Sequence, residues 1–283
     1  MRCLFVSDLH GRIDRYDKLF RAARHDRPDV VLLGGDLFPP FGAVPDAQRH
    51  DFLDEVIGAG ARRLHDDLGP RAPAILIILG NDDPLAHEAS LIEGDERGLW
   101  HYLHERHLER GGHIFVGYAH VPPSPFLQKD WERYDVSQYV DVGCVSPEEG
   151  FRTAPMSVRD LRYYTMARQI DDLATGVDQQ HAVWLFHAPP YETKLDRAAL
   201  DGARHEHVPL DVHVGSIAIR RFVRDRQPLL TLHGHVHESA RITGSWRDRI
   251  GRTHMFSAAH DGPELAIVRF DLDELSAATR ELI

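Results

Sequence analysis

Five short segments of strand length constrain the fold of this chain more than any other feature of its sequence. Each is built on an apolar run and leads into residue types that bind metals: residues 3–6, 29–36, 74–79, 182–186 and 229–232. Runs of this length suit strands that are buried on both faces of a sheet. Helical periodicity over residues 13–25 and 46–68, between the first three segments, predicts a parallel sheet with connecting helices, an α/β arrangement.

The residues at the ends of these strands form the candidate site. In chain order they are Asp8 and His10, Asp36, Asn81, His187, and finally His235 and His237. Ligands of parallel sheets bind at the carboxyl ends of the strands, so we expect these side chains to meet at one edge. Singly, each type is common as a cap, turn or loop residue. Their recurrence at five strand ends indicates a metal site of carboxylates, an amide and imidazoles.

Two local patterns carry further expectations. Asp8 and His10 are two residues apart, so on extended backbone their side chains point to the same side. Gly234 lets the backbone come close just before His235. Glu238 is placed to accept the second ring N–H of a ligand imidazole, the usual arrangement around a metal-bound histidine.

Five of the other histidines are interpreted as surface residues. Three of them fall within a predicted helical region over residues 85–110 and are spaced by three: His101, His104 and His107. No carboxylate-bearing strand end accompanies them, so they are expected on a solvated helix face. His205 and His207 lie in a polar loop, where a surface role is the default.

Composition limits the class of protein. At 283 residues, with a formal net charge of −11, the chain is expected to form one domain, and a small anionic substrate is favoured over nucleic acid. The longest apolar run, residues 74–79, is strand-sized, which predicts a soluble protein without a membrane span. Cys3 and Cys144 are the only cysteines, so we expect a reducing, cytoplasmic compartment. The oligomeric state is left open.

The remaining segments complete the prediction. Residues 112–117 are expected to form a strand, and residues 157–174 and 217–226 helices. The sequence pattern of residues 239–270 predicts three short strands, followed by a C-terminal helix. Residues 118–176 show no clear helical or strand periodicity and are interpreted as a long ordered insertion with aromatic anchors. This insertion forms a lid, a wall of the pocket or a structural flap, and the sequence does not decide among the three.

Taken together and in order, the strand-end motifs resemble the calcineurin-like metallophosphoesterase superfamily over essentially the whole chain. The resemblance implies a two-sheet β-sandwich flanked by helices, with a dinuclear metal site at one edge. By motif, it assigns Asp8, His10, Asp36 and His237 to one metal ion, and Asp36, Asn81, His187 and His235 to the other. Residues 187–196 and 213–216 also resemble a poorly characterised prokaryotic subgroup. This second resemblance says more about the lineage of the chain than about its substrate.

The chemistry of two metals agrees with this assignment. Two divalent ions about 3.5 to 4 Å apart need a shared carboxylate to offset their repulsion, and Asp36 suits that position. Their charge makes a metal-bound hydroxide available near neutral pH without a separate base. Mixed imidazole and carboxylate ligands suit Mn, Fe or Zn better than Mg or Ca, and the choice among the three is open.

Two departures from the family pattern bear on the reaction. Many members have a histidine after the motif asparagine, where it helps to protonate the leaving oxygen; this chain has Asp82. A carboxylate beside two cations is ionised and donates a proton poorly, so the leaving group is a better one or water protonates it. His260 stands in a second altered motif, residues 257–262, either as a substitute acid or, preferably, as a loop residue.

The resulting functional hypothesis is a dinuclear-metal-dependent phosphodiesterase acting on a small phosphodiester. His10, Asn81 and Asp82 are the candidate catalytic residues. A phosphomonoesterase, a nuclease and a non-catalytic scaffold of the same fold are the alternatives. The negative net charge counts against the nuclease, and the complete ligand set counts against the scaffold.

Overall fold

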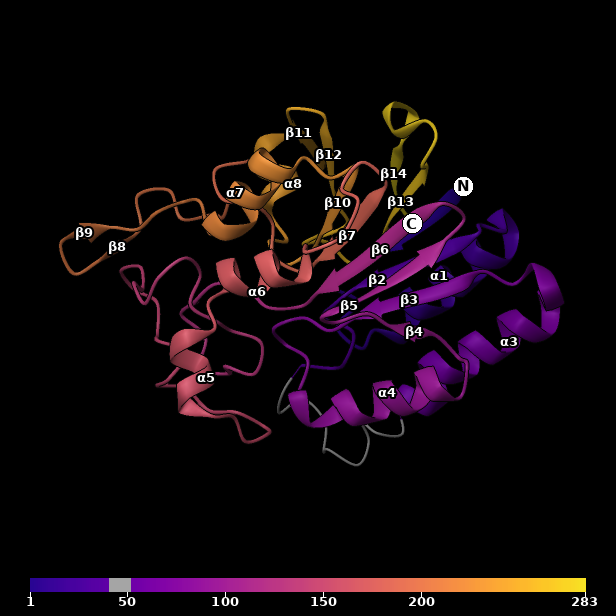
Figure 1. The fold of residues 1–283 in the computed structure, drawn as a ribbon, viewed down its shortest axis with the longest axis horizontal. Coiled ribbons are helices and arrows are strands. Elements are labelled where there is room, and N and C mark those ends of the chain that lie inside the picture. The colour runs from indigo at the N-terminus through magenta and orange to yellow at the C-terminus, as the bar shows by residue number, and fades with distance from the viewer. Residues whose placement is uncertain (41–51) are drawn as a thin grey trace.

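Two six-stranded sheets form the centre of the molecule (Figure 1). The computed structural model describes residues 1–40 and 52–283. The first sheet has the strand order β14-β13-β1-β2-β3-β4. Its strands are β1 (Arg2–Val6), β2 (Val30–Gly34), β3 (Ala74–Ile78), β4 (His101–Tyr102), β13 (Ala266–Asp271) and β14 (Thr279–Leu282). The strands β1 to β4 run parallel, as their apolar runs and connecting helices predict, while β13 and β14 are antiparallel additions at one edge.

The second sheet has the order β11-β12-β10-β7-β6-β5. Its strands are β5 (Arg106–Arg110), β6 (His113–Tyr118), β7 (Ala182–Phe186), β10 (Leu230–His233), β11 (Arg247–Ile250) and β12 (Thr253–Ser257). The core strands β6, β7, β10 and β12 are parallel, so the loops that follow β7 and β10 leave the sheet on the same side. A separate hairpin is formed by β8 (Arg204–His205) and β9 (Val208–Pro209).

Helices cover the outer faces of the two sheets (Figure 1). The segments associated with the first sheet are α1 (Ile13–Asp26), the π-helical η1 (Leu53–Gly58), α3 (Ala59–Leu68) with the 3-10 turn η2 (Gly69–Arg71), and the 3-10 turn η3 (Leu85–His87) with α4 (Glu88–Glu96). The later helices are α5 (Val158–Tyr163), α6 (Met166–Leu173), α7 (Ile217–Arg226), α8 (Ser239–Thr243) and the 3-10 turn η4 (Leu275–Ala277). Phe222 of α7 packs on Trp184 of β7, so α7 buries its apolar side against the second sheet.

The main core lies between and around the two sheets. Phe5 of β1, Leu32 of β2 and Leu76 of β3 are fully buried, and Leu185 and Leu232 from the second sheet belong to the same cluster. Burial of several such side chains, at about 1.5–3 kcal/mol each, fixes the two sheets against each other. The sandwich in turn brings the strand ends of both sheets to a common edge.

Most predicted elements are confirmed, and two are wrong. Residues 182–186 and 217–226 form β7 and α7 with the predicted bounds. The predicted C-terminal helix is instead the short turn η4 followed by β14, because the last residues pair antiparallel with β13. The helix predicted over residues 46–68 is observed from Phe52 onward, and its first part lies outside the described residues.

The predicted helical row of histidines is the second error. Helix α4 ends at Glu96, and Gly98 with φ 73° turns the chain into β4. His101 lies in β4 and His107 in β5, while the His104 side chain between them is only 8% exposed. His104 therefore belongs to the interior and not to a solvated helix face.

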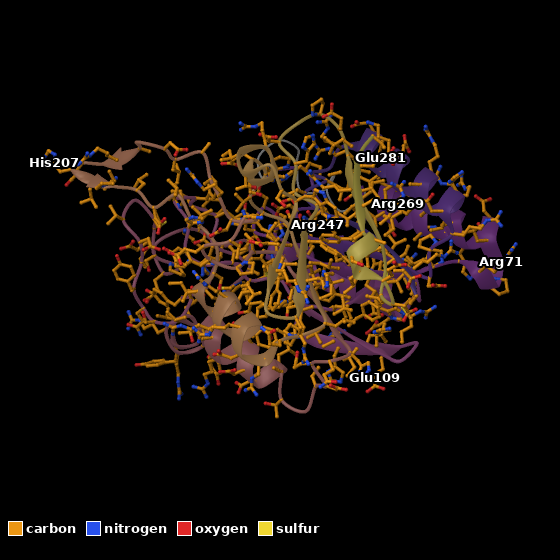
Figure 2. All side chains as sticks on the ribbon, turned by 90° about the horizontal axis from the view of Figure 1, so that it is seen from above. Arg71, Glu109, His207, Arg247, Arg269 and Glu281 are labelled. Atoms are coloured by element: carbon orange, nitrogen blue, oxygen red, sulfur yellow. The ribbon has the colours of Figure 1, made fainter. Side chains whose placement is uncertain are left out.

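The histidines of the polar loop are exposed, as expected. His205 is in β8, and His207 lies at the turn of the hairpin, which stands away from the body of the molecule in both views (Figures 1 and 2). Within the described part of the chain, no helix combines the length and the apolar character needed to cross a membrane.

Candidate metal centre

The predicted ligands sit on tight loops with unusual backbone conformations. Asp8, His10, Asp36 and His235 all have positive φ, at 56°, 48°, 53° and 73°. Non-glycine residues adopt this left-handed conformation rarely and at some cost, and such residues cluster at functional sites. The expectation that Asp8 and His10 share one face of extended backbone is therefore wrong, although both side chains do reach the same place.

Hydrogen bonds between neighbouring loops hold this backbone. The N–H groups of Asp8, His10 and Gly11 donate to the carbonyls of Gly35, Asp36 and Leu37, at 2.9, 2.8 and 2.9 Å. The loops after β1 and β2 thus run side by side for several residues. This pairing replaces the strand ladder at the sheet edge and fixes where each ligand side chain begins.

Four of the predicted ligands form one group. Asp8, His10, Asp36 and His237 each offer a ligand atom, and these atoms all lie within 4.8 Å of one another. His237 Nε2 is 3.2 Å from Asp8 Oδ1, and His10 Nε2 is 3.9 Å from Asp36 Oδ2. Both carboxylates are buried, while the His10 and His237 side chains are 16% and 34% exposed. The group is therefore open to solvent on its histidine side.

The other three predicted ligands converge beside it. Asn81 Oδ1 lies 2.6 Å from His235 Nδ1 and 3.1 Å from His187 Nε2. The same Nε2 atom of His187 is 3.3 Å from Asp36 Oδ2. Asp36 therefore faces both groups, and the structure brings all seven predicted side chains together.

The second group fits a cation. His187 Nδ1 lies 2.8 Å from the carbonyl oxygen of Gly34, which only accepts, so the ring proton is on Nδ1. Neutral His187 then presents its Nε2 lone pair to two other acceptors, Asn81 Oδ1 and Asp36 Oδ2. Lone pairs that converge in this way repel one another, and a metal ion or a proton between them removes the repulsion.

Without a metal, protons take up this role. Burial lowers the pKa of His187, but Asp36 outweighs it and raises the pKa to about 10. Burial likewise lowers the pKa of His237, while its hydrogen bond to Asp8 outweighs that and raises the pKa to about 9. Burial raises the pKa of Asp36, but the charge on His187 outweighs it and lowers the pKa to about 2. The carboxylates are thus arranged to attract positive charge.

Asp82, the residue in place of the family histidine, borders the first group. Its backbone N–H donates to Asp36 Oδ1 at 2.9 Å, and its Oδ2 lies 3.6 Å from His10 Nδ1. The charge on Asp36, together with burial, raises the pKa of Asp82 to about 7. Its side chain is 41% exposed, so it faces the opening of the site.

Two glycines make room for the ligands. A Cβ on Gly80 would collide with Asp36 Oδ1 and lie 2.5 Å from the Asp36 backbone nitrogen. A Cβ on Gly234 would lie 2.7 Å from Asp8 Oδ2. Any larger residue at these positions displaces the ligand carboxylates.

Two positioning residues escape sequence reasoning. Asp83 is fully buried and accepts hydrogen bonds from the N–H groups of Leu37, Phe38 and Gly80, each at 2.8 Å, so it joins the loops after β2 and β3. Arg15 donates to the carbonyls of Asp8 and Gly262 at 2.6 and 2.7 Å. The sequence gives one sign of the role of Arg15, which is its position among the buried residues of α1. The hydrogen-bond partners of Arg15 and Asp83 are backbone atoms, so the sequence does not reveal them.

Of the two nearby residues with suggested roles, Glu238 does not have the one expected. Glu238 accepts a hydrogen bond from the N–H of Ala199 at 3.0 Å instead of orienting a ligand imidazole. His260 lies 3.0 Å from Glu264, in agreement with a loop role.

Comparison with known proteins identifies the fold family. A family model described as calcineurin-like phosphoesterase matches residues 1–239. The protein TT1561 of Thermus thermophilus is similar in structure, with a TM-score of 0.59 and 15% identity over 99% of this chain and 98% of that chain. A dimetal phosphatase from Danio rerio has a TM-score of 0.53 and 13% identity over 95% and 91%. The phosphopantetheinyl hydrolase of Mycobacterium tuberculosis has a TM-score of 0.51 and 14% identity over 91% and 89%.

Identity at this level shows a common fold and no more. No curated protein matches the sequence. Because the family model covers most of the chain, and the two-sheet fold with its candidate ligands at the sheet edge agrees with it, the chain belongs to the calcineurin-like phosphoesterase family.

Proposed function

We propose that this protein is a dinuclear-metal-dependent phosphodiesterase that hydrolyses a small anionic phosphodiester. The observation that carries the proposal is the convergence of seven side chains on two adjacent positions, with Asp36 facing both. Asp8, His10, Asp36 and His237 are assigned to one ion. Asp36, Asn81, His187 and His235 are assigned to the other.

The donor set suits Mn, Fe or Zn, because imidazole is combined with carboxylate and amide oxygen. When bound, the two ions would supply an activated water and neutralise the charge that develops on the phosphoryl group. The protein's part is to hold the ligands in place through the loop hydrogen bonds and to orient Asn81, whose amide donates to Asp82 Oδ1 at 2.8 Å.

The preference for diesters rests on Asp82. A histidine at this position is suited to protonate the leaving oxygen at neutral pH, whereas cations beside Asp82 lower its pKa and keep it ionised. The proposed substrate therefore has a leaving group that departs without a strong acid from the protein. A monoesterase is the alternative, and a nuclease is disfavoured by the net charge of −11.

The proposal extends to the organisation of the chain. Residues 1–283 are proposed to form one domain, with residues 118–176 as an insertion that contributes a wall beside the metal centre. Its Trp131 is buried and donates to the carbonyl of Asp83 at 2.8 Å, so the insertion is anchored to the loop after β3.

The test is a side-by-side assay of metal-stripped protein reconstituted with Mn, Fe or Zn. Bis(p-nitrophenyl) phosphate and p-nitrophenyl phosphate serve as the diester and the monoester. Faster metal-dependent cleavage of the diester is expected. A monoester preference would reverse the proposed substrate class, and metal binding without cleavage of either ester would favour a scaffold.

A further inference from the structure

A cavity of about 380 Å³ opens beside the candidate metal centre. Its lining includes His235, which also belongs to the second ligand group. This volume is at the lower end of the range for small-molecule sites, which are mostly apolar and hold a ligand by a few polar groups. A molecule bound at the metal centre can therefore extend directly into the cavity.

Two segments of this chain form the walls. Residues 122–144 of the insertion supply one wall and residues 191–217, between β7 and α7, supply the other. The walls approach closely at Gly143, where a Cβ would lie 3.1 Å from Leu210 Cδ2. Most of the cavity is thus made by these two segments, and the loop after β10 completes it with His235, Val236 and Glu238.

Apolar side chains gather at this cavity and remain accessible. Phe126, Tyr139 and Val142 all line it and are 58%, 68% and 39% exposed. Large apolar groups exposed together mark ligand grooves more often than chance surface positions. Leu200 and Leu210 face them from the other wall.

The charged groups of the lining carry the second part of the argument. Its carboxylates are Asp135, Asp141, Asp211 and Glu238, and among the described residues that line the cavity there is no lysine or arginine. Asp211 accepts from the Tyr191 hydroxyl at 2.6 Å, and Asp135 accepts from Ser216 Oγ and two backbone N–H groups of α7. Asp135 and Asp211 are therefore satisfied within the protein, and none of the four carboxylates provides a positive charge for an anion.

We propose that this cavity holds the organic group of the phosphoester substrate and selects an apolar alcohol that carries no negative charge. The inference rests on the proposed phosphoesterase function and narrows its substrate class. The phosphoryl group lies at the metal centre, and the alcohol packs between Phe126, Val142 and Leu210. An alcohol with a carboxylate or a further phosphate would face four carboxylates and no lysine or arginine, so such esters are disfavoured.

The test uses three phosphonates that cannot be hydrolysed and share one head group: methylphosphonate, hexylphosphonate and 6-phosphonohexanoate. Their binding to the Mn-loaded protein is measured by calorimetry and by inhibition of bis(p-nitrophenyl) phosphate hydrolysis. Hexylphosphonate is expected to bind at least about tenfold more tightly than methylphosphonate, because burying a methylene contributes up to about 0.8 kcal/mol and tenfold corresponds to about 1.4 kcal/mol. The compound ending in a carboxylate is expected to bind no more tightly than methylphosphonate.

A matched pair of variants locates the effect. Leu210→Lys places a cation on the cavity wall, so it is expected to remove most of the advantage of hexylphosphonate and to strengthen 6-phosphonohexanoate. Val208→Lys adds the same charge on the exposed strand β9, outside the cavity lining, and is expected to leave the order of the three compounds unchanged.

The outcomes separate the two levels of the proposal. Equal binding of methyl- and hexylphosphonate, tighter binding of the carboxylate compound, or no binding of any phosphonate overturns the assignment of the cavity. Preserved diester hydrolysis in those cases leaves the phosphodiesterase proposal standing. Chain-length-dependent binding in calorimetry without hydrolysis of either nitrophenyl ester supports the cavity and contradicts the enzymatic function.

Discussion

The Nε2 atoms of His10 and His237 lie 3.1 Å apart although 227 residues separate them in the chain. Each ring also faces a buried carboxylate, Asp36 in the case of His10 and Asp8 in the case of His237. Two ring nitrogens this close share a proton or flank a common cation. The loops of the first and the second sheet therefore meet in one site, and the position that both rings face is the one assigned to the first metal ion.

The shared carboxylate gives the first prediction. Asp36→Asn removes the charge that offsets the repulsion of two ions, so we expect loss of at least one bound metal and a fall in diester turnover of about a thousandfold or more, since metal charge is worth several kcal/mol in the transition state. Metal content by elemental analysis and hydrolysis of bis(p-nitrophenyl) phosphate are the measurements. Asp17→Asn, on the exposed face of α1, is the control. Undiminished turnover in Asp36→Asn would refute the ligand assignment.

The strands and the ligand set illustrate what sequence can predict. A continuous apolar run such as residues 182–186 requires burial on both sides, and only a central strand provides it, so β7 follows from the sequence. Parallel topology gathers the strand-end residues of each sheet at one edge, and the packing of the two sheets brings these edges together. Neither conclusion depends on the details of any loop.

Other features depend on contacts that exist only in the folded chain. The left-handed backbone of Asp8 and His10 is held by carbonyls of the loop after β2. Arg15 and Asp83 bind backbone atoms, which every residue possesses, so their partners leave no trace in the sequence. The histidine spacing around His104 suggests a helix, but Gly98 interrupts it and long-range pairing of β5 with β6 decides the conformation.

The second prediction concerns the residue that replaces the family histidine. Asp82→His is expected to raise kcat/KM for phenyl phosphate by about tenfold relative to p-nitrophenyl phosphate, because it restores a group able to donate a proton at neutral pH and phenolate is the poorer leaving group of the two. General acid catalysis typically contributes about 10²–10⁴-fold to a rate. The side chain is 41% exposed, so an imidazole has room. Asp82→Asn removes the same carboxylate without adding an acid and is the control. An unchanged ratio of the two esters in Asp82→His would contradict the role assigned to this position.

The third prediction concerns the close approach of backbone and ligand at Gly80. The Cβ of Gly80→Ala would lie 2.5 Å from the backbone nitrogen of Asp36, which cannot move without breaking the paired loops. We expect a loss of about 1–3 kcal/mol in the free energy of unfolding, together with weaker metal binding. In Gly58→Ala the nearest atom is the flexible Arg62 Nη1 at 3.2 Å, and a helical alanine is favoured by up to about 1 kcal/mol. Urea unfolding compares the two, and equal stabilities would show that the loops adapt.

The fourth prediction uses a histidine away from the metal centre. Burial lowers the pKa of His104 to about 3, against 6.5 in the unfolded chain, and the ring packs against Trp131 at a centroid distance of 4.9 Å. Between these two pH values the unfolded chain binds a proton at this position that the folded chain does not bind. Its contribution to stability is therefore complete above about pH 6.5 and is lost as the pH falls, by roughly 1.4 kcal/mol per pH unit.

His104→Asn keeps an acceptor for the N–H of Ala119, which His104 Nδ1 accepts at 3.1 Å, but cannot titrate. Urea unfolding at pH 7, 6 and 5 gives the free energy of unfolding as a function of pH. Below about pH 6.5 this free energy should fall less steeply for the variant than for the wild type, by roughly 1.4 kcal/mol per pH unit, the contribution of one proton. The absolute stability at pH 7 is expected to drop, because asparagine fills less space, so the slope is the informative quantity. His205→Asn on the exposed hairpin is the control and should keep the wild-type slope. Parallel curves for His104→Asn and the wild type would mean that His104 is protonated in the folded protein and finds a partner for its charge.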